Sequence, residues 1–134
     1  MMAILAALAA NPDVLARVQG RWELDPAGSD ERGTYTCEAE PLTIITDAAR
    51  ARFASSRGEA ATAADILEVR DDAFLIRYDG EDRLDEAGRP VEWFLLLLDG
   101  DTRFAWVRRD WIDPSTGDIQ GATALRRRCP EPMS

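Results

Sequence analysis

The sequence contains neither histidine nor lysine, and this double absence narrows the chemistry that the chain can perform. Without histidine there is no Ser-His or Cys-His nucleophile pair, no imidazole metal ligand and no histidine-ligated haem. Without lysine there is no Schiff-base nucleophile and no P-loop lysine. We also find no nucleophile elbow, glycine-rich phosphate loop or paired metal ligands. We therefore predict a protein that is not an enzyme and that has no metal site and no cofactor.

Basic charge is scarce relative to acidic charge. The chain has 25 acidic residues against 16 basic ones, all of them arginine, and a formal net charge of -9. Such a field repels phosphate backbones and anionic lipid, so neither nucleic acid nor a membrane is an expected partner. The acidic run within residues 80–90 places Arg83 where a calcium ligand would be needed, which favours a solvated turn over a metal site.

Only two cysteines occur, Cys37 and Cys129, and they lack the CxxC spacing of zinc sites and thioredoxin-like centres. As free thiols they would be small core residues in a reducing compartment. As a disulfide they would close a loop of about 90 residues and stabilise the fold by roughly 4–5 kcal/mol in the chain-entropy model. The sequence leaves both interpretations open.

Long apolar runs are also rare. The stretch Met1–Ala10 is far too short to span a bilayer, and its alanine and leucine content favours a helix. The residues Asn11-Pro12-Asp13 predict the start of a second short helix, which Gly20 would end. We therefore expect residues 1–19 to be a helical N-terminal segment.

The same N-terminal stretch has a second interpretation as the end of a signal peptide. Ala7-Leu8-Ala9 would serve as the cleavage motif, although no basic residue precedes Arg17. The helical interpretation predicts a cytoplasmic protein, whereas the signal-peptide interpretation predicts a periplasmic one.

After Gly20 the sequence consists of short β-type runs separated by turn residues, which predicts about nine strands. The predicted strands are 21–24, 33–39, 42–46, 50–55, 64–70, 73–79, 91–98, 102–109 and 122–128. Asp71-Asp72 and Asp99-Gly100-Asp101 are typical of hairpin turns. We find no linker and no repeat. The pattern predicts a single domain, 1–134, of the all-β class: an antiparallel meander barrel of eight or nine strands over 20–129, whose closure removes both sheet edges.

The predicted strand 91–98 is apolar on both faces, although the outer face of a barrel normally meets solvent. Something must therefore cover Phe94, Leu96 and Leu98. The N-terminal helix is the first candidate, and a partner subunit in a homodimer is the alternative.

The triplet Gly20-Arg21-Trp22, at the entry to the first strand, resembles the GxW motif of lipocalins and the wider calycin barrels. In that family the tryptophan closes the base of the barrel beneath an arginine from the last strand. If Leu125 points inward, alternation makes Arg127 the partner of Trp22. A link between Cys37 and Cys129 would also suit a barrel, whose last strand pairs with its first. Bacterial metalloprotease inhibitors, which are small barrels with a similar entry motif, resemble the chain about as well.

A lipocalin-like barrel implies a non-enzymatic binding protein for a small, largely apolar ligand. The expected pocket residues are Phe74, Tyr78, Trp93, Phe104, Trp106 and Arg108. Arg108 or Arg77 would supply the polar anchor for a carboxylate. The alternative is that these side chains simply fill a small barrel, which would then act through protein interaction, as a bacterial protease inhibitor does.

Overall fold

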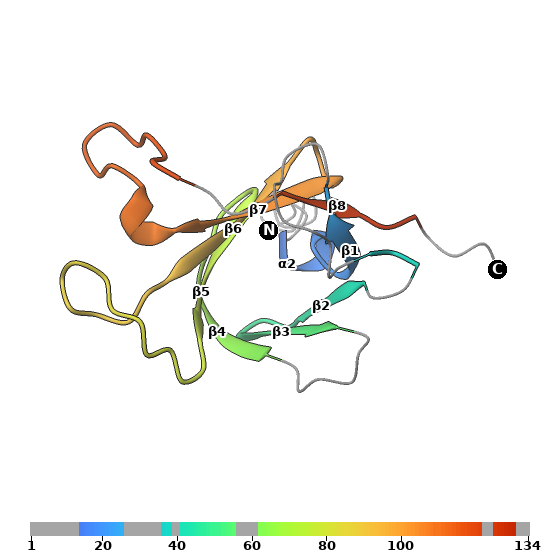
Figure 1. The fold of residues 1–134 in the computed structure, drawn as a ribbon, viewed down its shortest axis with the longest axis horizontal. Helices are drawn as coiled ribbons and strands as arrows, with labels where there is room; N and C mark the ends of the chain where they lie inside the picture. The colour runs from blue at the N-terminus through green and yellow to red at the C-terminus, as the bar shows by residue number, and fades with distance from the viewer. Residues whose placement is uncertain (1–13, 26–35, 39–40, 56–61, 122–124, 131–134) are drawn as a thin grey trace, which may run out of the picture.

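The computed structural model describes residues 14–25, 36–38, 41–55, 62–121 and 125–130, and these form a closed eight-stranded antiparallel barrel (Figure 1). Each strand pairs with the next along the chain, and β8 closes the barrel on β1. In chain order the elements are α2 (Val14–Arg17), β1 (Gly20–Leu24), β2 (Leu42–Thr46), β3 (Arg50–Ser55), β4 (Thr62–Val69), β5 (Ala73–Tyr78), β6 (Trp93–Leu98), β7 (Arg103–Arg108), the 3-10 helix η2 (Arg109–Trp111) and β8 (Arg126–Arg128).

The prediction of an all-β meander barrel is confirmed, with eight strands. β2 and β3 have the predicted bounds, and β1, β4, β5, β6 and β7 differ from them by at most two residues at either end. The predicted strand 33–39 is not confirmed: residues 33–35 and 39 lie outside the described part, and Cys37 is in a turn. Residues 1–13, on which the first predicted helix falls, also lie outside it, whereas α2 falls within the predicted second helix.

The register of the strands separates an inner face from an outer one. Trp22, Ile44, Phe74, Leu95 and Phe104 point inward and are almost completely buried in one core cluster. Their sequence neighbours on the strands point outward, as the period of two requires. A β-bulge between Ile66 and Glu68 interrupts the alternation on β4, so Val69 pairs with Phe74 at the end of the strand.

The two ends of the barrel are built differently. At the end that we call the base, the strands are joined by the short connections 47–49, 70–72 and 99–102. At the opposite end, which we call the open end, the connections are the longer segments 25–41, 56–61, 79–92 and 109–125. In the base turn 99–102, Asp99 and Gly100 have φ angles of 52° and 70°. Aspartate and glycine tolerate these left-handed angles, which explains the DG pair.

The helix α2 closes the base. Its Val14 and Leu15 are buried in the core cluster, and Val18 just after it is fully buried. Arg17 fixes the helix to two base turns, because its side chain contacts the carboxylates of Asp101 at 2.8 Å and Asp72 at 3.0 Å. The apolar side chains of α2 and Val18 therefore pack against the end of the barrel and not against its outer wall.

The outer face of β5 and β6 forms a second, smaller hydrophobic cluster of Ala73, Leu75 and Phe94. The described residues that pack against it are Leu96 and Ile112, and the Arg70 guanidinium lies 4.7 Å from the centre of the Phe94 ring. The Ala/Leu helix expected to cover this face falls within residues 1–13, whereas α2 packs against the base. Residues 1–13 lie outside the described part. Within the described ranges, no helix is long and apolar enough to cross a membrane.

Candidate ligand site at the open end of the barrel

At the base, Trp22 lies under an arginine of the last strand, but the arginine is Arg128 and not Arg127. The Arg128 guanidinium is 4.2 Å from the centre of the Trp22 ring, and the Trp22 indole N–H donates to the carbonyl of Val18 at 3.0 Å. Arg128 also donates to three backbone carbonyls, those of Asp101 at 2.9 Å, Gln19 at 2.9 Å and Arg17. This arginine is therefore a structural closure of the base.

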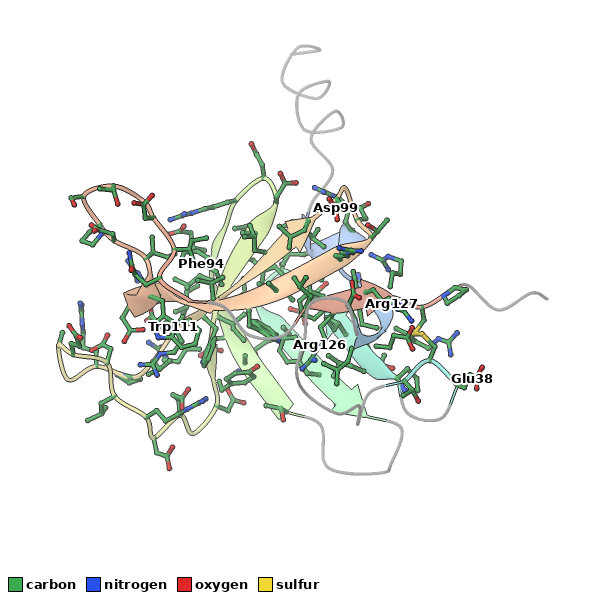
Figure 2. The ribbon with its side chains drawn as sticks, turned by 45° about the horizontal axis from the view of Figure 1, so that its top comes forward. Glu38, Phe94, Asp99, Trp111, Arg126 and Arg127 are labelled. Carbon is green, nitrogen blue, oxygen red and sulfur yellow. A yellow bond between two sulfur atoms is a disulfide. The ribbon has the colours of Figure 1, made fainter. Side chains whose placement is uncertain are left out.

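The prediction of Arg127 failed because it assumed an inward Leu125, which lies outside any strand. The pairing of β8 with β1 decides instead which residues point inward. Trp22 faces Arg128 and Leu24 faces Arg126, so residue 127 points outward. There the Arg127 side chain binds the carboxylate of Glu23 at 2.7 Å. Figure 2 labels both Arg126 and Arg127 on this strand.

The glycine of the motif is explained by the same contact. Gly20 has a φ of 130°, and a Cβ atom built there would lie 2.9 Å from Nη1 of Arg128. A side chain at position 20 would thus collide with the arginine that covers Trp22. The glycine, the tryptophan and Arg128 form one packing unit.

Cys37 and Cys129 form a disulfide, with their Cα atoms 5.5 Å apart. The backbone N–H of Cys129 donates to the carbonyl of Arg21, and that of Cys37 donates to the Glu23 carboxylate, both at 2.9 Å. This hydrogen bond from Cys37, with the added effect of Arg127, holds the pKa of Glu23 below its usual range. The disulfide therefore fixes the connection before β2 to the seam between β1 and β8.

The predicted pocket residues all lie on the inner side of the barrel wall, but at two depths. Phe74 and Phe104 are fully buried, and the Phe104 ring contacts Trp22 at the base with a centroid distance of 4.8 Å. Trp93, Trp106 and Tyr78 lie nearer to the open end, with Arg108 at the end of its strand. The other four lie nearer to the open end, where Trp93 and Trp106 still belong to the buried core cluster and Tyr78 packs against it.

Three aromatic rings meet at the open end. Phe53 contacts Tyr78 and Trp106 in edge-to-face geometry, with centroid distances of 5.9 Å and 5.3 Å, and the latter two are 6.3 Å apart. The Trp106 ring also contacts the Phe104 ring, with a centroid distance of 5.8 Å, so the row of rings extends from the open end into the core. Tyr78 and Trp106 are among the expected pocket residues, whereas Phe53 is not, although alternation within 50–55 places it on the same face as Ala51.

Trp93 is enclosed by groups from two loops of the open end. The Trp111 ring lies 5.5 Å from it edge-to-face, and the Arg83 guanidinium lies 5.4 Å from its centre. Arg83 also forms two hydrogen bonds with the buried carboxylate of Glu81, at 2.9 Å and 2.7 Å. These bonds hold the pKa of Glu81 below its usual range. The connection 79–92 is thereby fixed against the rim of the barrel.

The two arginines that were predicted as anchors are both engaged with carboxylates. Arg108 forms two hydrogen bonds with Asp110, at 3.0 Å and 2.8 Å. Arg77 points to the outer face, where it lies 3.6 Å from Glu92. Arg108 is therefore a residue of the rim, and Arg77 does not face the interior.

Arg126, which was not among the predicted residues, also points into the barrel. It pairs with Leu24 on β1 and with Phe104 on β7, both of which face inward, and its Nε and Nη1 atoms are buried. Figure 2 labels it toward the middle of the molecule. The assumption that Leu125 points inward reversed the expected sides of residues 126–128, so Arg126 was expected on the outer face.

A shallow groove of about 280 Å³ lies outside the barrel, between the connections 79–92 and 109–125. Its lining carries both charges, including Asp85, Glu86 and Arg109, and also Ile112. Among the residues that the structure describes, no three acidic or cysteine side chains are grouped to hold a metal ion. The groove therefore has no chemistry that favours one kind of ligand.

The geometry defines the class of protein as a closed eight-stranded antiparallel barrel with a helix over its base. Comparison of the chain with protein-family models, with curated proteins and with solved structures finds no match.

Proposed function

We propose that the chain is a lipocalin-like, non-enzymatic binding protein that takes a small, largely apolar ligand at the open end of its barrel. The observation that carries the proposal is the group of Phe53, Tyr78 and Trp106, whose rings face one another at the opening. Aromatic side chains at a concave end give apolar contact area at low entropic cost, and a few polar groups then orient the ligand.

The asymmetry of the ends supports the same function. The base is closed by α2, Trp22 and Arg128, so a ligand would enter only between the long connections of the open end. Tyr78 is half-buried there, and its ring combines an apolar body with a hydroxyl group.

A neutral apolar dye such as Nile red tests the proposal, because it reports apolar sites by fluorescence. We expect saturable one-to-one binding to the wild type. Ala64, which is fully buried and faces inward opposite Tyr78, is the position at which to obstruct the opening. Ala64→Phe should weaken dye binding about 10-fold or more, since overpacking displaces the rings beside it. Ala63→Phe on the outer face is the matched control and should bind as the wild type does.

Native mass spectrometry of protein purified from its own host provides a test without a dye. A mass excess that denaturation removes would be a bound ligand and would support the proposal. A bare mass together with no saturable dye binding would overturn it. The filled barrel that acts through protein interaction would then be the better interpretation.

A further inference from the structure

The lower half of the barrel is filled by side chains of its own core. Trp22, Phe74 and Phe104 are completely buried there, and Leu95 from the facing strand is buried beside them. The Phe104 ring lies edge-to-face against Trp22, with a centroid distance of 4.8 Å. Because protein interiors are packed with few voids larger than a water molecule, these side chains form a floor beneath the open end.

The rings at the open end rest directly on this floor. Trp106 meets Phe104 at a centroid distance of 5.8 Å, and Phe53 meets Trp106 at 5.3 Å. Centroid distances of this size are those of rings in direct contact. A long apolar chain could therefore go deeper than Trp106 only by displacing completely buried side chains.

Little of the upper rings is accessible, and their arrangement is specific. Phe53 is 7% exposed and Trp106 is 8% exposed, whereas Tyr78 is half-buried. The planes of the three rings are inclined to one another by 66°, 71° and 53°. A further aromatic ring can extend such edge-to-face packing and gain energy beyond its buried area, whereas a saturated ring has no π system to do so.

We propose that the ligand is a compact molecule with one aromatic ring, which packs against Phe53, Tyr78 and Trp106 and stops above Phe104. This inference rests on the proposed function and narrows its ligand class to ring compounds in place of long alkyl chains. Phe104 is then the residue that determines specificity for ligand length, because its side chain limits the depth of the site.

Benzyl alcohol and cyclohexylmethanol test the preference for an aromatic ring, because both have seven carbons and one hydroxyl group. Each is used to displace Nile red from the wild type. We expect benzyl alcohol to bind about 3- to 10-fold more tightly, the gain expected for an aromatic contact. Phe53→Leu removes one of the three rings and should bring the two alcohols to within about twofold. Phe94→Leu on the outer face is the matched control and should keep the preference.

A series of straight-chain alcohols from butanol to decanol tests the depth of the site. Each methylene that becomes buried should tighten binding about fourfold. We expect this increase to end at about six carbons, after which each methylene adds less than about 1.5-fold because the floor stops the chain. A fourfold gain per methylene up to decanol would show that the chain enters the barrel and would overturn the inference.

Phe104→Ala tests the floor itself. Removal of the ring leaves an apolar cavity beneath Trp106, and such cavities bind apolar molecules. Decanol should bind about 10-fold or more tightly to this variant than to the wild type, whereas benzyl alcohol should change less than about threefold. Phe94→Ala makes the same substitution on the outer face and should change neither. A folded Phe104→Ala that binds decanol as the wild type does would overturn the role of Phe104.

Circular dichroism checks the fold of each variant. If Phe104→Ala does not fold, Phe104→Leu removes part of the ring and should still tighten decanol relative to benzyl alcohol. The failures are distinguishable: if Nile red shows no saturable binding, the proposed function fails. If the dye binds but benzyl alcohol does not displace it, or has no advantage over cyclohexylmethanol, the aromatic ligand is wrong although the apolar site stands.

Discussion

The base and the open end use the same two residue types, tryptophan and arginine, for different purposes. At the base, Arg128 covers Trp22 and donates to three backbone carbonyls, while the tryptophan is completely buried. At the open end, Arg83 and Arg108 lie beside Trp93 but bind carboxylates of the exposed connections.

Under the proposed function, this difference would separate stability, at the base, from recognition, at the open end. Backbone acceptors cannot titrate or move independently of the fold, so the contacts of Arg128 are as rigid as the wall itself. Carboxylates on loop side chains, in contrast, can titrate and can move with their loops. We expect substitutions at the base to change the free energy of unfolding and substitutions at the open end to change ligand binding.

The largest expected effect comes from Trp22. Trp22→Ala removes a fully buried ring and its hydrogen bond to Val18, so it should lower the free energy of unfolding by about 3–5 kcal/mol. Trp111→Ala at the open end is the matched control and should cost about 1–2 kcal/mol, because that ring is only partly buried. Urea denaturation measures both. Equal costs would contradict the division between the two ends.

The disulfide should have the next largest effect. Cys37→Ser combined with Cys129→Ser opens a loop with a sequence separation of 92 residues. We expect the free energy of unfolding to fall by about 2–5 kcal/mol, chiefly because the unfolded chain gains freedom. Denaturation of the wild type with and without reductant is the parallel measurement. A variant as stable as the oxidised wild type would show that the bond does not stabilise the barrel.

Neighbouring arginines of β8 sharpen the comparison within one strand. Arg128→Lys loses the planar stacking on Trp22 and part of the fork to the carbonyls, so it should destabilise the protein by about 1–3 kcal/mol. Arg127→Lys keeps an exposed pair with Glu23 and should change stability by about 0.5 kcal/mol or less. Thermal unfolding of the two variants side by side tests this order, and the reverse order would restore Arg127 as the structural residue.

The smallest effect concerns acid. The pKa of Glu23 is lowered from its ordinary value of 4.5 by the Cys37 N–H and by Arg127. A carboxyl whose pKa is lower in the folded state than in the unfolded state gives its full stabilisation at a pH above the ordinary pKa. The protein loses this stabilisation as the pH falls through the folded-state pKa. Stability should therefore decrease below about pH 4.5, and less steeply in Glu23→Gln. Parallel pH curves for the two proteins would count against this role.

The strands and their turns could be predicted because each depends on local pattern. Alternation in 42–46 and 50–55 and the DG turn at 99–100 determine β2, β3 and the base turn without reference to the rest of the chain. The closed topology could be predicted because unpaired sheet edges are unfavourable. Eight meandering strands leave two such edges unless the last strand pairs with the first.

The site could be predicted only in part. The inward parity of Phe74, Tyr78, Trp93, Phe104 and Trp106 follows from alternation within long strands. Arg126 and Arg128 could not be assigned in this way, because β8 has three residues and its parity is set by pairing with β1, which is 104 residues away for Glu23 and Arg127. The disulfide likewise depends on a contact between chain ends that local pattern does not specify.

The disulfide also makes most of the barrel a covalent ring. The bond joins a residue before β2 to one after β8, so seven strands lie inside the closed loop while α2 and β1 lie on the segment outside it. β1 is thus joined to this ring through its C-terminal end alone, and it lies between the two strands that flank the closure and pairs with both. A single proteolytic cut in the connection 79–92 would leave two fragments joined as one molecule, which only a reductant would separate.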